Sequence, residues 1–341
     1  MQNKSFKKIL IIAPSWIGDA VMMHSLLRYL HKQKRIELHV LASPLIASIV
    51  EGYMPEVSKV IRFTCAHGEL GLKKRYRLGK MLKKQSYDQA IILPNSFKSA
   101  LIPWFAKIPK RTGWRGEWRY GLLNNLRVLD KNKYPLAASR YLALGFSKCQ
   151  DIPTHHFWPK FLVNPDEVKA CVTRFNINPQ KTIIALCPGA AYGTAKQWPA
   201  EYFAHLTVEL DKRGYLVIIL GSNDAKDAAK RMMQLHQSNA LNLVNKTILS
   251  EVVNILSLAS VVVTNDSGLM HIAAALDRHI IAIYGSSSPK YTPPLSERAT
   301  ILVRQLDCQP CFKRICPLKH LACLRGIKPK AVLAAIEELL Q

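Results

Sequence analysis

Short apolar segments alternate with helical segments along most of the 341-residue chain, and this alternation restricts the possible folds more than any other feature. Strand-like runs of the first half lie at residues 8–13, 37–42, 59–63 and 89–93, with helical patterns at 20–31, 45–51 and 72–85. The second half repeats the alternation, with strand-like runs at 182–186, 216–220, 241–244, 261–264 and 279–284. Strands that alternate with helices form parallel sheets covered on both faces. The sequence therefore predicts an α/β fold.

A break in this alternation divides the chain into two parts. A chain of this length usually forms two domains, each with its own core. At residues 151–167 prolines and the adjacent His155 and His156 replace the apolar periodicity, so we place the interdomain linker there. We expect a first domain over residues 1–160 and a second over 161–327, followed by a C-terminal helical segment at 328–341. The two histidines are assigned to the linker because no partner ligands are nearby.

The charge of the chain implies an anionic partner. The sequence has 48 Lys and Arg against 23 Asp and Glu, a formal net charge of +25. The partner could be nucleic acid, an anionic membrane face or a polyphosphorylated substrate, and charge alone does not choose among them. No apolar run is long enough to span a bilayer. The apolar run at 9–13 is followed at once by Pro14, so we interpret it as a first strand and not a signal peptide, and we expect a cytoplasmic protein.

The carboxyl ends of parallel strands are the first places to look for a site. The loop after the first strand contains Gly18 and Asp19. A dinucleotide-binding turn needs three spaced glycines, and only Gly18 is present, so a nicotinamide or flavin enzyme is disfavoured. Asp19 could cap the following helix, or it could be a carboxylate beside a glycine that accepts a proton from a substrate.

A basic and aromatic region follows the strand at 89–93. Its polar residues begin with Asn95, Ser96 and Lys98, and its cations Lys110, Arg111, Arg115 and Arg119 are interleaved with Trp114, Trp118 and Tyr120. A guanidinium presents a planar fork of donors that suits phosphate. A nucleic-acid surface could look similar, and a solvated basic loop over packed aromatics is an equally simple interpretation.

Two loops of the second half favour a nucleotide diphosphate. The strand at 261–264 stops at Asp266 and Ser267, where a helix N-cap is expected, and Gly268 leaves the first helical turn open. Unpaired N–H groups at such a turn bind anions, although an ordinary capped helix has the same pattern. Lys196, on the glycine-containing loop at 188–199, suits a diphosphate clamp. Because GxxxxGK[ST] and an acidic metal pair are lacking, we expect binding without an obligatory metal and not a P-loop NTPase.

Four cysteines near the C-terminus have spacing typical of a metal site. Cys308 and Cys311 form a CxxC pair, and Cys316 and Cys323 follow with a wider separation. A structural Zn²⁺ is one interpretation, and reduced thiols are the other. Structural disulfides are not expected in a cytoplasmic protein.

Five longer motifs resemble the ADP-heptose:lipopolysaccharide heptosyltransferases, which are glycosyltransferase family 9, and within that family the type II branch. They are KKILIIAPSWIGD at 7–19, LPNSFKSAL at 93–101, RTGWRGEWRYGLLN at 111–124, the segment 188–199, and TNDSGLMHIAAAL at 264–276. The resemblance extends to about residue 294. It implies a GT-B glycosyltransferase with two Rossmann-like domains around a cleft, and a C-terminal helix, 328–341, that packs back on the first domain. The segment 308–323 departs from the pattern, which leaves the end of the second domain less defined.

The resemblance also implies a reaction. An L-glycero-D-manno-heptose would move from ADP-heptose to the first heptose of the Kdo₂–lipid A inner core, with inversion and with no metal cofactor. Asp19 matches the family's base, and Lys196 would stabilise the departing ADP. Donor-binding residues would be Gly18, Thr194, Lys196, Asp266, Ser267, Gly268, Leu269, Met270 and His271. Acceptor-binding residues would be Asn95, Ser96, Lys98, Arg111, Arg115 and Arg119.

The resemblance implies a cytoplasmic enzyme, peripheral on the inner membrane, whose basic residues meet anionic lipid and acceptor but no nucleic acid. Two alternatives stay open. One is a related GT-B enzyme with another donor or acceptor, for example of heptosyltransferase I or III type. The other is a basic, non-catalytic binding module.

Overall fold

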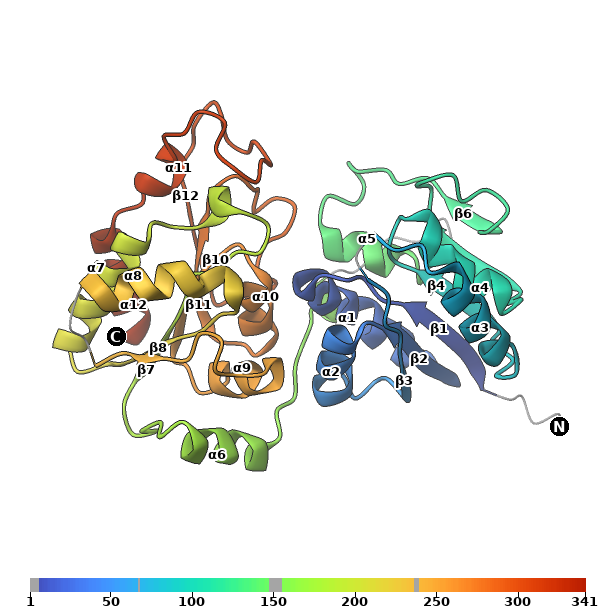
Figure 1. Ribbon diagram of the computed structural model, residues 1–341, viewed down its shortest axis with the longest axis horizontal. Coiled ribbons are helices and arrows are strands. Elements are labelled where there is room, and N and C mark those ends of the chain that lie inside the picture. Colours follow the sequence, from blue (N-terminus) through green and yellow to red (C-terminus); the bar gives the residue numbers. More distant parts are fainter. Residues whose placement is uncertain (1–5, 67, 147–154, 236–238) are drawn as a thin grey trace. The chain divides into compact units, whose positions relative to one another are not determined.

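The computed structural model describes residues 6–66, 68–146, 155–235 and 239–341 (Figure 1). The chain divides into two compact units, Met1–Pro159 and Lys160–Gln341. Residues 151–154 of the expected linker lie outside the described residues. None of the helices in the described ranges is both long and apolar enough to cross a bilayer.

The first unit is built on a six-stranded parallel sheet with the order β3-β2-β1-β4-β5-β6. Its strands are β1 Lys7–Ile12, β2 Ile36–Ala42, β3 Lys59–Arg62, β4 Gln89–Ile92, β5 Lys110–Trp114 and β6 Asn125–Arg127. Its helices are α1 Ile17–His31, α2 Pro44–Tyr53, α3 Leu72–Lys83, α4 Leu101–Phe105 and α5 Ala137–Ala143, with short 3₁₀ turns η1 Phe97–Ala100 and η2 His155–Phe157. β1 is central, because it pairs with β2 through Ile11↔Val40 and with β4 through Ile11↔Ile91.

The second unit repeats this architecture with the order β12-β11-β10-β7-β8-β9. Its strands are β7 Ile183–Cys187, β8 Leu216–Ile219, β9 Leu241–Asn242, β10 Val261–Asn265, β11 His279–Tyr284 and β12 Ala299–Val303. Its helices and 3₁₀ turns are α6 Pro165–Arg174, η3 Thr194–Lys196, α7 Ala200–Lys212, η4 Asn223–Ala225, α8 Lys226–Leu235, α9 Leu249–Leu256, α10 Gly268–Ala275, α11 Ala322–Arg325 and α12 Pro329–Leu340. The two sheets confirm the predicted parallel α/β class.

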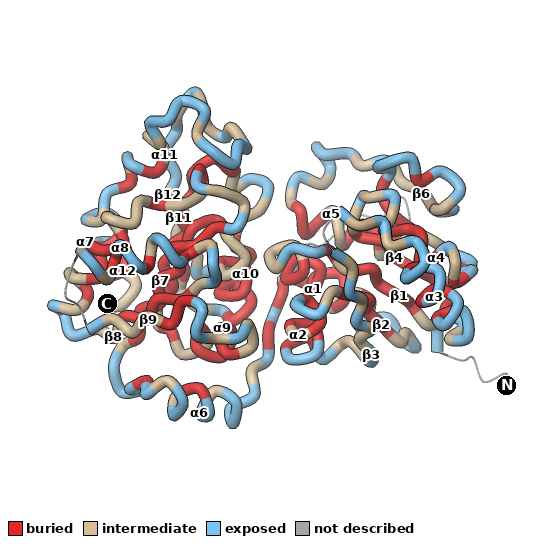
Figure 2. The backbone as a smooth tube through the Cα atoms, in the orientation of Figure 1, coloured by how far each residue is buried: buried red, intermediate tan, exposed pale blue. Residues whose placement is uncertain are grey.

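The central strands are apolar throughout because helices cover both of their faces. Every residue of β4, β7 and β10 is buried, and Figure 2 shows the buried backbone gathered inside each unit. In the second unit, the fully buried Trp198 and Phe203 pack with Val263 and Ile283. Burying such aromatic and β-branched side chains contributes about 2 kcal/mol each.

The C-terminal helix α12 enters the core of the second unit, and our expectation that it packs on the first domain stays a prediction. It contacts α7 and β11 of its own unit, and Val332, Leu333 and Ile336 enter that unit's core. Its apolar side chains recur at helical spacing and need a hydrophobic partner, which α7 and β11 supply.

Several elements were missed in the sequence. β5 and β6 lie in the basic and aromatic region, for which we predicted no strands. Its exposed cations mask a short run of buried residues such as Thr112 and Trp114. β12 at the sheet edge and α6, which begins at the end of the expected linker, were also missed. Helix α1 begins at Ile17 and not at residue 20, so Gly18 and Asp19 are helical.

Candidate functional site

In the second unit, the sheet order reverses between β7 and β10, and two of the predicted loops meet there. β7 pairs with β8 on one side and with β10 on the other, so the loops that leave these strands diverge. Such a switch point is the usual ligand site of a parallel sheet. Lys196, after β7, and Asp266, after β10, form an ion pair with Nζ and Oδ2 2.6 Å apart. The structure thus joins two of the predicted donor-binding residues directly.

Three contacts hold Lys196 and its loop in place. Asn265 donates from Nδ2 to the Pro188 carbonyl and accepts at Oδ1 from the Trp198 N–H, at 2.7 and 2.9 Å. The Lys196 ammonium lies 5.0 Å from the centroid of the Tyr192 ring, a cation–π distance. Thr194 is exposed at the start of η3. These contacts hold the lysine at the carboxyl end of the sheet before any ligand binds.

The first turn of α10 is the second part of this site. Ser267 occupies the N-cap position but makes no side-chain capping bond within the described chain; its hydroxyl lies 3.3 Å from Thr264 Oγ1. The first N–H groups of a helix have no partner within it, so those at Gly268 and Leu269 suit an anion. Both residues are half-buried at the mouth of the turn.

The side chains of Met270 and His271, which we predicted to bind the donor, point into the core. Both are buried, and Met270 Sδ accepts a hydrogen bond from the Tyr284 hydroxyl. Helical rotation explains this, since residues one turn beyond the N-cap face the sheet. The Met270 backbone N–H lies in the open first turn and is suited to contact a ligand, whereas the His271 N–H is at the position that donates to the carbonyl of the N-cap Ser267.

Burial and the ion pair set the electrostatics around α10. Burial, with a further effect from the Lys196 ammonium, lowers the pKa of His271 to about 4, although Asp266 opposes the shift. His271 is therefore neutral at pH 7. Burial, reinforced by Asp266, also raises the pKa of the Tyr284 phenol well above its usual range. The ion pair of Lys196 and Asp266 therefore lies beside two neutral side chains, those of His271 and Tyr284.

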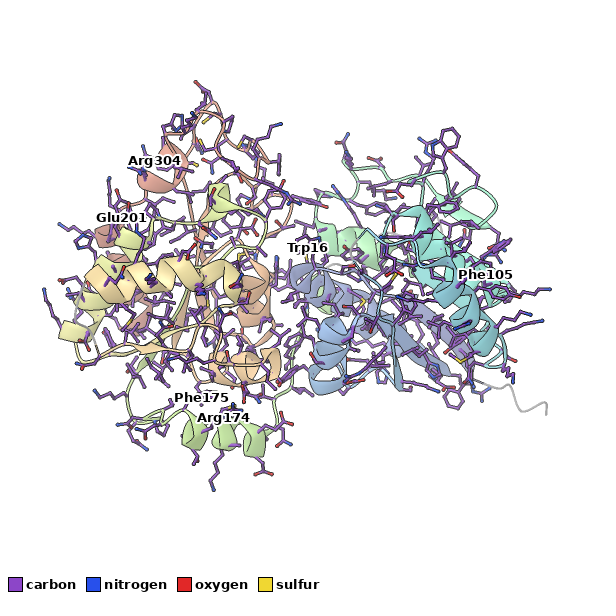
Figure 3. All side chains as sticks on the ribbon, in the orientation of Figure 1. Trp16, Phe105, Arg174, Phe175, Glu201 and Arg304 are labelled. Atoms are coloured by element: carbon purple, nitrogen blue, oxygen red, sulfur yellow. The ribbon has the colours of Figure 1, made fainter. Side chains whose placement is uncertain are left out.

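In the first unit, the corresponding switch point lies between β1 and β4, and Asp19 follows β1. Trp16 is the N-cap of α1 (Figure 3), so Gly18 and Asp19 are its second and third residues and Asp19 is not the cap. The Asp19 carboxylate is half-buried and accepts a hydrogen bond of 2.8 Å from the Tyr141 hydroxyl of α5. The contact fixes one carboxylate oxygen, Oδ1, by a donor that lies 122 positions away in the sequence.

Three of the six predicted acceptor-binding residues follow β4, and Arg115 follows β5. Asn95 and Arg115 are exposed, Ser96 is half-buried, and Lys98 donates to the Glu69 carbonyl at 3.4 Å. The Glu117 carboxylate accepts from the Phe97 N–H at 2.8 Å and joins this loop to the β5–β6 connection. Polar and cationic groups therefore gather at the carboxyl end of β4.

Arg119 and Arg111 have structural contacts that the sequence did not indicate. Arg119 is 1% exposed and donates to the carbonyls of Pro94 and Trp114 and to Asn95 Oδ1. Burial lowers its pKa to about 10, which leaves it charged at pH 7. Arg111 donates to the carbonyls of Leu122 and Ile108 at 2.6 Å each. The Arg119 guanidinium is thus enclosed and bound to backbone carbonyls, and its role as an acceptor ligand stays a prediction.

The cysteine-rich segment supports the Lys196 loop. The Arg314 carbonyl accepts from the Ala195 N–H at 3.0 Å, and Phe312 N–H donates to the Ser286 carbonyl at 2.7 Å. Gly193, at φ +152°, is required here, since a Cβ would lie 2.3 Å from the Arg314 carbonyl oxygen. The segment thus positions the backbone that leads to the lysine.

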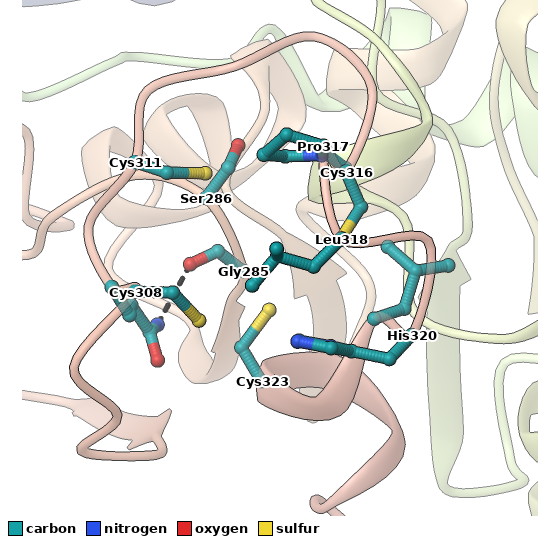
Figure 4. Close-up of a pocket in the computed structure, with 12 residues that line it drawn as sticks. Gly285, Ser286, Cys308, Cys311, Cys316, Pro317, Leu318, His320 and Cys323 are labelled. Carbon is teal, nitrogen blue, oxygen red and sulfur yellow. Dashed lines mark hydrogen bonds between the residues drawn. The ribbon is translucent and has the colours of Figure 1, made fainter.

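The structure does not support the predicted zinc site. Cys308, Cys311, Cys316, Cys323 and His320 line a cavity of about 20 Å³ (Figure 4). Yet in the described part of the chain no three His, Cys, Asp or Glu side chains form a group that could hold a metal ion. The CxxC spacing placed the thiols around one cavity but did not bring them into a coordination set.

Sequence reasoning missed four residues of these sites. Tyr141 comes from a segment with no motif, and Tyr192 lies within the 188–199 motif but was given no role; the structure places them against Asp19 and Lys196. Asp224 lies against Gly189, where a Cβ would be 2.6 Å from Oδ2, and its carbonyl accepts from Gln197. Asn265 could have been found from the sequence, because it directly precedes Asp266 at the end of a predicted strand.

Comparison with known proteins identifies the family of this chain. The model of glycosyltransferase family 9 (heptosyltransferase) matches residues 75–322. Lipopolysaccharide heptosyltransferase 2 of Salmonella typhimurium is 43% identical over 86% of this chain and 87% of its own length. Lipooligosaccharide heptosyltransferase 2 of Haemophilus influenzae is 45% identical over 86% of this chain and 88% of its own. The solved structure of E. coli ADP-heptose lps heptosyltransferase II matches with a TM-score of 0.88 and 38% identity, covering 98% of each chain. The chain therefore belongs to glycosyltransferase family 9, the heptosyltransferase family, and has the GT-B fold of two Rossmann-like domains.

Proposed function

We propose that this glycosyltransferase moves a heptose from ADP-heptose to the first heptose of the Kdo₂–lipid A inner core, with inversion at the anomeric carbon. The observation that carries the proposal is the Lys196–Asp266 pair at the N-terminus of α10, in a chain 43% identical to a lipopolysaccharide heptosyltransferase 2. The E. coli protein of matching structure is an ADP-heptose lps heptosyltransferase, which supports the same donor here.

The second unit would hold the donor. The diphosphate would take hydrogen bonds from the N–H groups at Gly268 and Leu269 and a charge contact from Lys196. Lys196 would then turn partly from Asp266, and the freed carboxylate would accept hydrogen bonds from the sugar hydroxyls. As the bond from the anomeric carbon to the β-phosphate oxygen breaks, negative charge grows on ADP. Positive groups fixed in advance around that oxygen stabilise the transition state.

The first unit would hold the acceptor and the base. The Asp19 carboxylate would take the proton of the acceptor hydroxyl while that oxygen bonds to the anomeric carbon. Tyr141 would hold the carboxylate in place through its 2.8 Å hydrogen bond. Asn95, Ser96, Lys98 and Arg115 would meet the phosphates and carboxylates of the acceptor, and Arg119 would act indirectly by holding Asn95.

The remaining parts of the proposal concern metal and location. Lys196 and the α10 N-terminus supply positive charge at the leaving group, so we expect transfer to persist in the presence of a chelator. The acceptor is a lipid, and we propose that the enzyme works on the cytoplasmic face of the inner membrane, with its +25 charge favouring anionic lipid.

Thermal unfolding with ADP, UDP and NAD⁺ tests the donor. ADP should raise the Tm of the wild type, and Lys196→Met should reduce that shift. UDP stabilisation without an ADP effect would identify a different donor.

Transfer assays with ADP-heptose and the lipid acceptor test the base. Asp19→Asn should lower kcat by about 10²–10⁴ while ADP stabilisation stays unchanged. The exposed Asp130→Asn in the same unit is the matched control and should keep full activity. Retained turnover in Asp19→Asn would reject the assigned base.

A further inference from the structure

We propose that the exposed face of α3, with Trp104 of the neighbouring α4, is the surface that docks this enzyme on an anionic lipid bilayer. We call it the α3 face and define it by Leu72, Lys73, Tyr76, Arg77, Lys80, Met81, Lys84 and Trp104. The inference rests on the proposed function, in which the acceptor is a lipid, and deepens it by naming the contact surface.

The α3 face carries concentrated positive charge. Seven Lys and Arg residues and no Asp or Glu lie between Leu70 and Gln85. One of them, Arg75, turns inward, where it is buried and donates to the Leu70 carbonyl at 2.7 Å. Among the ion pairs of the described residues, the only one from α3 joins Lys74 to Glu69. The cations of the α3 face are therefore available to an external anionic surface.

Large apolar side chains lie among these cations. Leu72, Tyr76 and Met81 are 50%, 46% and 60% exposed, and Trp104 is 45% exposed. The inward side of α3 is already buried, because Leu78 and Leu82 are part of the hydrophobic core of the first unit. The exposed apolar residues thus belong to the solvent side and not to an incomplete core.

The aromatic part of the face is supported from beneath. The Phe105 ring packs edge-on against Tyr76 with centroids 5.2 Å apart, and Trp104 packs against Phe105 with centroids 5.1 Å apart. Gly79 allows the close approach of the two helices, since a Cβ there would be 2.4 Å from Phe105 Cβ. Lys80 lies 5.4 Å from the Tyr76 ring centroid, so charge and ring are presented together.

A bilayer fits this combination better than nucleic acid does. An interfacial helix places cations at lipid headgroups and apolar side chains at the acyl boundary, and Trp and Tyr favour that depth. Nucleic acid would use the cations and could stack on the aromatics, but it offers no apolar phase for Leu72 and Met81.

Vesicle sedimentation with the full chain tests the proposal. The vesicles contain phosphatidylcholine alone or mixed with phosphatidylglycerol. Wild type should bind the anionic vesicles. Lys73→Ser/Arg77→Ser/Lys80→Ser should bind about 100-fold more weakly, at about fivefold per charge. The matched control is Lys226→Ser/Lys230→Ser/Arg231→Ser on α8, which removes three cations from the other unit and should bind as wild type.

A second variant separates lipid from other polyanions. Leu72→Ser/Met81→Ser keeps every charge and should weaken vesicle binding by about tenfold or more, while binding to single-stranded RNA stays unchanged. Equal vesicle binding by wild type and the α3 charge variant would overturn the proposal, as would an equal loss in the α8 control. Unchanged vesicle binding in Leu72→Ser/Met81→Ser would overturn it too, in favour of a general polyanion surface. ADP stabilisation, measured on every variant, reports on the proposed function independently of vesicle binding.

Discussion

The ion pair between Lys196 and Asp266 gives the sharpest prediction, because both side chains are largely enclosed. Lys196 is 17% and Asp266 5% exposed, and their charged atoms are 2.6 Å apart. The carboxylate charge is shared by two oxygens, so we take the centres of the two charges to be about 3.5 Å apart. With an effective dielectric constant near 20, their attraction is then about 5 kcal/mol, and the desolvation of both groups offsets much of it. Removing one partner leaves the other buried and uncompensated, which is the larger effect.

We therefore expect Lys196→Met to lower the free energy of unfolding of the second unit by about 3 kcal/mol. Asp266→Asn should cost less, about 1–2 kcal/mol, because the partly exposed ammonium can reach water and still lies over the Tyr192 ring. The double variant should lose less than the sum of the two, with a coupling free energy of about 1–3 kcal/mol.

Urea titration followed by ¹⁹F spectra of 5-fluorotryptophan protein measures these values. Trp198 is the only tryptophan after residue 160, so its signal reports unfolding of the second unit. The m-value should stay constant across the variants. Losses that add within about 0.5 kcal/mol would refute the reasoning, since independent side chains show no coupling.

Three further predictions concern the surroundings of these sites. His271→Gln should flatten the acid dependence of stability: the unfolded imidazole binds a proton below about pH 6.5 and the folded one below about pH 4. Wild type should therefore lose up to about 3 kcal/mol as pH falls through this window, as urea midpoints at several pH values would show, and an equal slope in His271→Gln would contradict this. Arg119→Met should lower the free energy of unfolding by about 2–4 kcal/mol, because the carbonyls of Pro94 and Trp114 lose an enclosed donor. Arg115→Met should change it by less than about 0.5 kcal/mol. Unfolding midpoints would measure both; normal stability with lost activity in Arg119→Met would restore a direct role for Arg119. Gly193→Ala should lower the Tm and weaken ADP stabilisation, because its Cβ would collide with the Arg314 carbonyl. In the control Gly214→Ala the new Cβ meets nothing within 4 Å, so this variant measures the effect of the positive φ alone. Equal effects of the two variants would show that the contact with Arg314 is unimportant.

The alternation of apolar strands and helices determined the fold class, because a run such as Val261–Asn265 can be buried on both faces only in a helix-covered parallel sheet. The strand ends then located Asp19, Lys196 and Asp266, since parallel strands carry their loops at one edge. Short strands such as β5 escaped detection because three buried residues give no clear period.

Tertiary structure decided which of the candidate side chains are free to act. Arg115 and Arg119 are four positions apart on the same basic segment, yet one is exposed and the other is enclosed by the carbonyls of Pro94 and Trp114. The cysteines show the same limit, since their spacing gathered them around one cavity without forming a metal-binding group within the described chain. Sequence specifies residue types and their order along strands and helices, whereas contacts over long separations, such as Tyr141 with Asp19, depend on how the elements pack.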